Sequence, residues 1–496
     1  MFCLFVMTMS LLCETVTSQS MAELVAARDG ATHGDMVELR LDGVRDVDVA
    51  GALQGRRVPA VVTCRPTWEG GRFDGSEEER VTILSRALEL GAEFVDVEWR
   101  ATRHSNGAFT AIVNREPARV ILSSHDFDGV PHDLDDRVRA MRGIGAGSIK
   151  VAVTVSRLTE TLPLREIGNS GDAIVIGMGE AGVPSRLLAA HYGSRWTYAG
   201  HGVAPGQLLA TTMADDFHFF RVGPETAVYG VVSTDAMHSL SPVMHNAAFE
   251  AAGIDAVYVP LRACDFEDFL SFAAAMGVQG ASITIPFKLD ALRAAQSADA
   301  LTQSVGAANT LRRGSDGWEA TNTDVYGFLA PLDAVFGTRL QEARAAVLGA
   351  GGAARAVVAA LRSRGAHVTV YARRPAQAQQ LAQSLDASAG EWPPRTGSWD
   401  VLVNSTPLGG AGKRDESPLP AEAVSGPLVY DLTYAPGGPS PLLRDAKAAG
   451  ALTIDGLPML VAQAERQFEW WTGQKPEPGV MANAIKRKLA VVERTL

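Results

Sequence analysis

The stretch AAVLGAGGAARAVVAAL at residues 345–361 decides the fold of the second half of this chain. Its first four residues are apolar, as in a short buried strand, and an alanine- and valine-rich helical run follows the glycines. The pattern GAGGAA at 349–354 lies between them, in the strand–turn–helix context that a dinucleotide-binding fingerprint requires. Backbone N–H groups at the helix start would bind a pyrophosphate. We therefore predict a Rossmann-type domain over residues 336–455.

The next predicted strand, HVTVY at 367–371, indicates which dinucleotide is bound. At the end of this strand an NAD site usually has an acidic residue that binds the ribose hydroxyls. This chain has Arg373 and Arg374 there instead, and two guanidinium groups favour the 2′-phosphate of NADP(H). The alternative is a solvated basic turn.

The first half of the chain alternates short apolar segments with helical stretches, which is typical of a parallel sheet built from βα units. Eight such strands within residues 10–210 predict a small closed (β/α)8 barrel. A linker over 211–226 contains Gly223 and Pro224, and βα alternation resumes at 227. The strand candidates of the barrel include 11–16, 36–42, 60–65, 94–99, 120–126, 148–153 and 173–179.

Several predicted barrel strands carry charged residues, which are not expected inside apolar segments. Glu38, Arg40 and Asp42 alternate with apolar residues and so face the same side of one strand. Asp96 and Glu98 repeat this pattern on a later strand. These charges predict a polar barrel interior, which is either a catalytic site or a structural network of ion pairs.

Lys150 is the most informative of the strand charges, because it stands between apolar residues in SIKVAV at 148–153. A charged ammonium is costly to bury, and a neutral amine in a dry barrel suits Schiff-base formation with a ketone. His125 follows another apolar run, VILSS at 120–124, and adds a group able to accept and donate protons.

In these segments the first half resembles the type I 3-dehydroquinate dehydratases. The resemblance implies a barrel that removes water from 3-dehydroquinate to give 3-dehydroshikimate. The matching segments, in the family's order, are VELRLD at 37–42, TCRPTWEGG at 63–71, VDVEW at 95–99, SSHDF at 123–127, IKVAV at 149–153, GVPSRL at 182–187 and APGQ at 204–207.

The resemblance also implies roles for residues. Lys150 would form the imine, His125 would act as general base and then general acid, and Glu98 would orient the imidazole. One departure is Val203, at a position where family members often carry a hydroxyl residue. The residues implied for substrate binding are Glu38, Arg40, Arg65, Arg186, which would clamp the carboxylate, and Gln207.

Polar residues also recur inside apolar surroundings in the second half. Singly, each of these Ser and Asn residues fits a helix cap or a turn. Together the segments resemble the shikimate dehydrogenases over residues 228–496, which implies a substrate-binding α/β domain at 227–335 and C-terminal helices at 456–496 that return to it. The segments are HSLSPVMHN at 238–246, ASITIPFK at 281–288, GAANT at 306–310, TNTD at 321–324, NSTP at 404–407, DLTYAP at 431–436 and GLPMLVAQA at 456–464.

This second resemblance implies a catalytic dyad of Lys288 and Asp324 beside the carbonyl to be reduced. Ser233 and Ala236 depart from the glycine and proline that family members often have before the substrate-binding serines. The implied substrate contacts are Ser239 and Ser241 for the carboxylate, Tyr434 near it, and Thr284, Asn309 and Gln463 for ring hydroxyls. The implied cofactor contacts are Gly349, Ala350, Gly351, Gly352, Ala353, Arg373, Arg374, Leu432 and Gly456.

Composition excludes several other classes of protein. The formal net charge of −11 argues against a nucleic-acid-binding surface, and no apolar run of about 18 residues predicts a membrane helix. The start of the chain lacks the positive region and small-residue cleavage site of a signal peptide, so we expect a cytoplasmic protein, with an organelle as the alternative. We assign no role to residues 1–9. Neither the four cysteines nor His238 and His245 have the spacing of metal ligands.

Because the product of the first reaction is the substrate of the second, we predict one bifunctional enzyme that converts 3-dehydroquinate to shikimate in aromatic amino-acid biosynthesis. Its partners would be these small molecules and NADP(H). One alternative is a second half that acts on quinate with NAD. The other is a metabolite-sensing regulator, which we would expect to have lost Lys150, His125 or Lys288, and all three are present.

Overall fold

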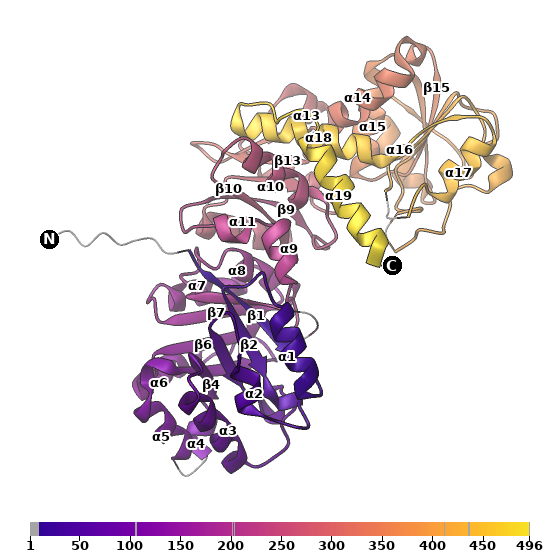
Figure 1. The fold of residues 1–496 in the computed structure, drawn as a ribbon. Coiled ribbons are helices and arrows are strands. Elements are labelled where there is room, and N and C mark those ends of the chain that lie inside the picture. Colours follow the sequence, from indigo (N-terminus) through magenta and orange to yellow (C-terminus); the bar gives the residue numbers. More distant parts are fainter. Residues whose placement is uncertain are drawn as a thin grey trace. The chain divides into compact units, whose positions relative to one another are not determined.

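The computed structural model describes residues 9–104, 107–200, 202, 204–410, 412–434 and 437–495. These residues form two compact units (Figure 1). Unit 1 contains the chain up to residue 228 together with 235–237 and 255–277. Unit 2 contains 229–234, 238–254 and the chain from 278 onward.

Unit 1 is built on an eight-stranded parallel sheet of order β7-β6-β5-β4-β3-β2-β1-β8, in which β1 pairs with both β2 and β8. Arg195 N–H donates to the Ala173 carbonyl at 3.0 Å where β7 and β8 begin, so the sheet is a nearly closed barrel, as predicted. The strands are β1 Leu11–Thr17, β2 Met36–Arg40, β3 Ala60–Thr63, β4 Phe94–Glu98, β5 Val120–Asp126, β6 Ser148–Thr154, β7 Ala173–Met178 and β8 Trp196–Ala199.

Helices alternate with these strands and lie around the outside of the barrel (Figure 1). One of them begins with a capping box, in which the Ser76 side chain accepts the Glu79 N–H and the Glu79 carboxylate accepts the Ser76 N–H. The helices are α1 Met21–Gly30, α2 Val49–Leu53, α3 Glu77–Glu89, α4 Ala101–His104, α5 Ala108–Arg115, α6 Leu134–Ile144, α7 Leu162–Gly168 and α8 Val183–Leu187. The predicted linker carries α9, Ala210–Asp215, and a 3-10 turn, Phe219–Arg221.

The barrel interior changes from apolar to charged along its strands. Met36 and Ile121 belong to a buried apolar cluster inside the barrel. Side chains two residues apart in a strand share a face, so Glu38 follows Met36 and His125 follows Ile121 on the inner side. The carboxyl ends of the strands therefore place polar groups inside the barrel. In (β/α)8-barrel enzymes the active site lies at this end of the strands.

A second sheet has six strands in the order β10-β9-β11-β13-β14-β12 and is mixed, because β11 is parallel to β9 and antiparallel to β13. Strand β10 and helix α11 fall within unit 1. The strands are β9 Ala227–Ser233, β10 Ala256–Arg262, β11 Gly280–Ile283, β12 Ser297–Ala298, β13 Thr310–Arg313 and β14 Trp318–Thr321. The helices between them are α10 Ser241–Ala251, α11 Phe266–Met276, α12 Lys288–Ala294 and α13 Ala300–Val305.

The third sheet is parallel, with strand order β17-β16-β15-β18-β19-β20, and confirms the predicted Rossmann-type fold. The strands are β15 Arg344–Leu348, β16 His367–Tyr371, β17 Ser388–Ala389, β18 Val401–Asn404, β19 Leu428–Asp431 and β20 Leu452–Ile454. The helices are α14 Asp324–Val335, α15 Gly352–Ser363, α16 Pro375–Ser384, α17 Pro441–Ala448, α18 Gly456–Thr472 and α19 Val480–Thr495.

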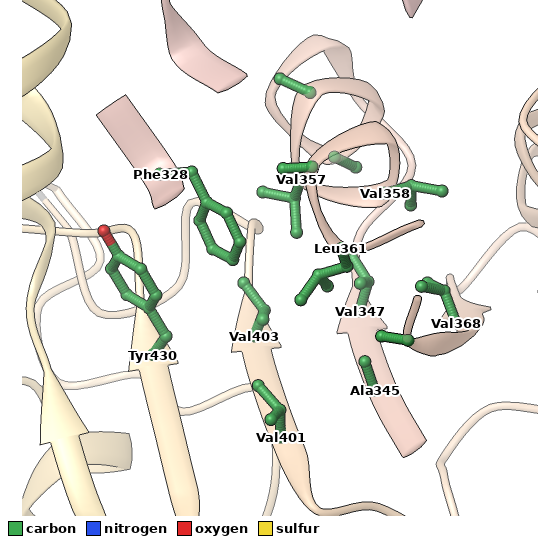
Figure 2. Close-up of a cluster of buried hydrophobic side chains, with 14 of the residues drawn as sticks. Phe328, Ala345, Val347, Val357, Val358, Leu361, Val368, Val401, Val403 and Tyr430 are labelled. Atoms are coloured by element: carbon green, nitrogen blue, oxygen red, sulfur yellow. The ribbon is translucent and has the colours of Figure 1, made fainter. Parts of the chain in front are cut away.

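Successive residues of β15 pack on opposite faces of this sheet. Val347 lies with α14, α15 and α16 in one buried cluster, whereas Leu348 lies with α17 in another. In the first cluster Phe328 stacks on Tyr430, with ring centroids 4.8 Å apart (Figure 2). The alternation explains why the strand is apolar at every position from Ala345 to Leu348: a parallel strand covered on both faces has no solvated side.

Two helical glycines of the barrel should respond in opposite ways to alanine. A Cβ on Gly143 would meet nothing within 4 Å, so Gly143→Ala should raise the free energy of unfolding by about 0.5–1 kcal/mol. A Cβ on Gly168 would lie 1.8 Å from the Tyr192 carbonyl oxygen, so Gly168→Ala should lower it by about 1–3 kcal/mol. Urea unfolding of the full chain measures both changes. A stable Gly168→Ala protein would contradict the close approach of helix and carbonyl.

Candidate functional sites

The charged end of the barrel encloses a cavity that contains most of the residues predicted for the first site. Among the groups that line it are the side chains of Lys150, His125 and Arg186. The cavity is also lined by Thr15, Glu38, Arg40, Arg65, Glu69, Gly70, Phe127, Ala152, Ile176, Met178, Tyr198, Ala204, Pro205 and Gln207.

Lys150 projects from β6 into this cavity and is 5% exposed. Its Nζ lies 3.5 Å from Asp96 Oδ2 and 3.8 Å from Glu38 Oε1, and 4.0 Å from the centre of the Tyr198 ring. Two carboxylates and an aromatic face stabilise an ammonium ion. The surroundings of Lys150 are therefore more polar than the apolar sequence around it suggested.

His125 lies beside Lys150 because Ser123 pairs with Lys150 between β5 and β6, and His125 is two residues further along the same face. Burial and the nearby cation of Arg65 lower the pKa of His125 to about 4. The imidazole is therefore neutral at pH 7, the form that a general base requires.

The carboxylate that contacts this imidazole is Glu69, and this corrects the role predicted for Glu98. Glu69 Oε1 lies 3.4 Å from His125 Nδ1 and accepts the His125 backbone N–H at 2.8 Å. Glu98 is fully buried and binds two arginines instead, Arg65 Nη1 at 2.7 Å and Arg80 Nη2. Charge balance explains this difference, because a buried carboxylate is stable only where cations or other donors surround it.

A sequence signal for Glu69 was present. It stands in TCRPTWEGG at 63–71, one of the segments on which the resemblance depends, four residues after Arg65. It lies in a 3-10 turn, Thr67–Glu69, so no strand periodicity indicates the direction of its side chain. Its position in the turn at the open end of the barrel brings it over His125.

Arg186 has the environment expected of an anion-binding group. It is 1% exposed, and burial lowers the pKa of its guanidinium to about 10. Its only hydrogen bonds within the described chain are long ones, at 3.4 Å to the carbonyls of Tyr198 and Pro205, and its Nε has no partner there. A buried cation without a carboxylate partner favours binding of an anionic ligand.

The other residues predicted for this site also line the cavity. Arg40 forms a bidentate pair with Asp42, at 2.7 and 2.9 Å. Glu38 accepts hydrogen bonds from Thr15 at 2.9 Å and Thr63 at 2.8 Å. Gln207 donates to Thr15 Oγ1 at 3.4 Å. Val203 lies outside the residues that the structure describes.

The predicted dyad of the second site is a direct ion pair. Lys288 and Asp324 are the first residues of α12 and α14, and Lys288 Nζ lies 2.5 Å from Asp324 Oδ2. Asn309 Nδ2 donates to the other oxygen of Asp324 at 2.8 Å and lies 3.4 Å from Gln463 Oε1. The structure thus brings four predicted residues together, with the lysine held by a carboxylate that is itself oriented by an amide.

The remaining predicted substrate contacts of unit 2 lie on nearby loops and helix starts. Ser241 N–H donates to Ser239 Oγ at 3.2 Å at the start of α10. Thr284 N–H donates to the Val232 carbonyl at 3.1 Å. Tyr434 follows β19, and burial raises the pKa of its hydroxyl.

In the altered turn before the serines, Ser233 Oγ donates to the Ile285 carbonyl at 2.9 Å, and Ala236 is buried. The serine that replaces the expected glycine therefore gains a hydrogen bond of its own.

The glycine loop between β15 and α15 fits a dinucleotide pyrophosphate. Gly349 has φ of +111°, which favours glycine, and a Cβ on Gly351 would meet nothing within 4 Å, so space remains beside the helix start. A Cβ on Gly352 would lie 3.1 Å from Lys288 Cδ, so the loop and the dyad are neighbours. A Cβ on Gly456 would lie 2.3 Å from the Leu432 carbonyl oxygen. Ala350 and Ala353 complete this loop and helix start.

Arg373 and Arg374 lie directly after β16, and both side chains are exposed. No ion pair within the described chain engages either of them, so both guanidinium groups are available to a phosphate at this strand end. The residues present therefore fit NADP(H) better than NAD.

A buried lysine beside an imidazole in a barrel cavity, and a second buried lysine that pairs with a carboxylate beside a glycine loop, are typical of an enzyme with two active sites. Family models agree with this division. Residues 12–223 match type I 3-dehydroquinase, residues 231–311 the shikimate dehydrogenase substrate binding domain, and residues 456–486 the shikimate 5'-dehydrogenase C-terminal domain.

Known proteins are similar to one half or to both. A bifunctional 3-dehydroquinate dehydratase/shikimate dehydrogenase, chloroplastic, from Arabidopsis thaliana is 33% identical over 94% of this chain and 82% of its own. A shikimate dehydrogenase (NADP(+)) from Trichormus variabilis is 37% identical over 54% of this chain and 99% of its own. A crystal structure of a shikimate dehydrogenase in complex with NADP+ has a TM-score of 0.50 at 32% identity, over 53% of this chain and 96% of that one. The chain belongs to the family of bifunctional 3-dehydroquinate dehydratase/shikimate dehydrogenases.

In the described part of the chain no helix is long and apolar enough to span a membrane. Within the same residues no three His, Cys, Asp or Glu side chains are grouped as metal ligands.

Substitution of the two glutamates separates their roles. Glu69→Gln removes the anionic partner of His125, and we expect kcat for dehydration to fall about 10–100-fold with little change in stability. Glu98→Gln leaves two buried arginines with one carboxylate fewer, and we expect the free energy of unfolding to fall by about 3–5 kcal/mol. Steady-state kinetics and thermal unfolding distinguish these outcomes. A stable Glu98→Gln enzyme with the larger loss of kcat would restore the role first predicted for Glu98.

Proposed function

We propose that this chain dehydrates 3-dehydroquinate to 3-dehydroshikimate in the barrel and reduces 3-dehydroshikimate to shikimate with NADPH in unit 2. The observation that carries the proposal is the placement of Lys150 and His125 in one cavity with Arg186, a buried guanidinium that has no carboxylate partner among the described residues. A ketone, an acidic α-proton and a carboxylate are the features of the substrate that these three groups recognise.

In the dehydration, the amine of Lys150 gives up one proton and attacks the ketone carbon, and return of that proton with loss of water gives a protonated imine. His125 then removes the proton on the neighbouring carbon, and the electron pair forms an enamine. The enamine expels the hydroxyl group of the next carbon, which leaves as water with the proton from His125. Hydrolysis of the imine restores Lys150 and releases the product, so one water is lost overall.

The remaining residues of the barrel orient the substrate for these steps. Arg186 clamps the carboxylate, and Glu69 fixes the tautomer and direction of the imidazole. The residues that bind the hydroxyl groups are Glu38, Arg40, Arg65 and Gln207.

NADPH, when bound, supplies the hydride for the second reaction. Lys288 stabilises the developing alkoxide and donates the proton that completes the alcohol, while Asp324 holds its ammonium group in place. Ser239 and Ser241 bind the carboxylate, with Tyr434 near it, and Thr284, Asn309 and Gln463 bind ring hydroxyls. The residues that hold the cofactor are Gly349, Ala350, Gly351, Gly352, Ala353, Arg373, Arg374, Leu432 and Gly456.

One assay tests both activities. The purified chain receives 3-dehydroquinate and NADPH, and the ultraviolet absorbance of the enone should rise before NADPH is consumed. A parallel reaction with quinate and NAD tests the alternative substrate, and faster turnover there would overturn the assignment of unit 2. For location we propose the cytoplasm, with an organelle as the alternative that the chloroplastic relative supports.

Lys150 should be the site of the covalent intermediate, because it is the only lysine before Lys288. Borohydride added with 3-dehydroquinate should reduce the imine and label one peptide, the one that contains Lys150. Lys150→Met should abolish dehydration while the reduction of directly supplied 3-dehydroshikimate continues, and Lys288→Ala should do the reverse. Mass spectrometry of the labelled chain and the two separate assays check this. A label on another residue would exclude the mechanism.

Arg373 and Arg374 should determine the choice of cofactor. Replacing both by alanine removes about 1.5–3 kcal/mol for each charged hydrogen bond lost, so KM for NADP should rise at least about tenfold. KM for NAD, which has no 2′-phosphate, should change little and serves as the control. Equal use of NAD and NADP by the unmodified chain would contradict the assignment.

A further inference from the structure

We propose that Asp268, on helix α11, is a positioning residue for the dehydratase site in the barrel. The inference rests on the dehydratase function proposed above. Asp268 belongs to residues 255–277, which the sequence places in the shikimate-binding domain but which form one compact unit with the barrel. Neither resemblance assigns it a role.

The carboxylate of Asp268 is almost fully buried and binds the loop that follows β6, the strand that carries Lys150. Its Oδ2 accepts the Leu158 N–H at 3.0 Å, and its Oδ1 accepts the Thr159 N–H at 3.0 Å and the Thr159 hydroxyl at 2.8 Å. Cys264 N–H donates to it at 3.3 Å, and Arg157 Nε lies 3.8 Å away. Because a buried carboxylate is costly to leave unpaired, these bonds hold the loop in one position.

A second residue of the same segment contacts two loops of the barrel. Arg262, at the end of β10, donates to the Ser156 carbonyl at 3.3 Å and lies 3.3 Å from Glu180 in the loop after β7. This pair is partly exposed and contributes less than the buried carboxylate. Residues 255–277 thus bind the loops after β6 and β7, at the end of the barrel where the cavity opens.

Backbone hydrogen bonds connect the anchored loop to the groups that bind substrate. Val155 N–H donates to the Met178 carbonyl at 3.0 Å, and Gly179 N–H donates to the Pro205 carbonyl at 3.1 Å. The same Pro205 carbonyl accepts from Arg186 Nη2 at 3.4 Å. Met178, Pro205 and Arg186 all line the cavity, so the loop that Asp268 holds is joined to its wall.

The expected effect is on substrate binding more than on chemistry. Lys150 and His125 lie on neighbouring strands whose positions the β5–β6 ladder fixes. Arg186 and Gln207 depend on the segments after β7 and β8 instead. If those segments move, the carboxylate clamp loosens in the ground state and the transition state alike, which raises KM and changes kcat little.

The test uses Asp268→Asn in the full chain, because the amide keeps the size of the carboxylate but turns an NH2 toward N–H donors. We expect KM for 3-dehydroquinate to rise about tenfold or more, with kcat within about threefold of the wild type. Reduction of directly supplied 3-dehydroshikimate should change less than about twofold. Asp265→Asn is the matched control, because it preserves the N-cap of α11 and removes an exposed pair with Arg157 at 3.0 Å.

Substitution of Thr159 provides a second variant, which should lower the free energy of unfolding less than Asp268→Asn does. Thr159→Val removes one hydrogen bond to Asp268 and should raise KM about threefold, whereas Thr159→Ser keeps the hydroxyl and should restore it. Amide hydrogen exchange should become faster at Leu158 and Thr159 in the valine variant. If Asp268→Asn folds and its KM for 3-dehydroquinate equals that of the wild type, the inference is overturned. If Asp268→Asn does not fold, a wild-type KM in Thr159→Val overturns it. A wild-type chain that traps no imine would overturn the proposed function instead.

Discussion

The dehydratase site depends on how the barrel stabilises buried negative charge, and Arg65 is at the centre of that arrangement. Its guanidinium binds Asp96 and Glu98 at 2.7 Å each and Ser123 at 2.8 Å, all inside the barrel. Arg65, together with Lys150, depresses the pKa of Asp96 far below its usual range although burial opposes this. Without Arg65, Asp96 and Glu98 would each lose a direct ion-pair partner inside the barrel, and their charged forms would be less stable.

In unit 2 the main constraint is close packing, because the glycine loop, Lys288 and helix α14 must lie close together. Small residues make this possible: Gly352 leaves room for the Lys288 side chain, and a Cβ on Gly327 in α14 would lie 2.7 Å from Gln463 Cβ in α18. The dyad and the amide that orients Asp324 thus come from helix starts and facing helices. At these two positions glycine is needed because a neighbouring segment packs closely against it, and not because the local backbone has an unusual conformation.

Strand periodicity predicted the barrel and its interior charges because side chains two residues apart share a face, as Met36 and Glu38 do. It could not predict partners. Glu98 does face the interior, but Arg80, from a helix outside the strands, competes for its carboxylate, while Glu69 reaches His125 from a turn that has no periodicity. Strand periodicity also could not predict that residues 255–277 belong to unit 1, because this depends on long-range contacts such as those of Asp268.

The same buried charges surround both catalytic groups of the barrel. The carboxylates of Glu38 and Asp96 and the Tyr198 ring lie against Lys150 Nζ, whereas burial and Arg65 lower the pKa of His125 to about 4. Imine formation needs a neutral amine, so a proton must leave Lys150 before the ketone is attacked. His125 lies in the same cavity but accepts that proton only at a cost, since its pKa is about 4. Arg186 lines the same cavity as His125, so a substrate carboxylate bound there would add negative charge that favours a protonated imidazole, and the chemistry of Lys150 would then depend on binding of the carboxylate.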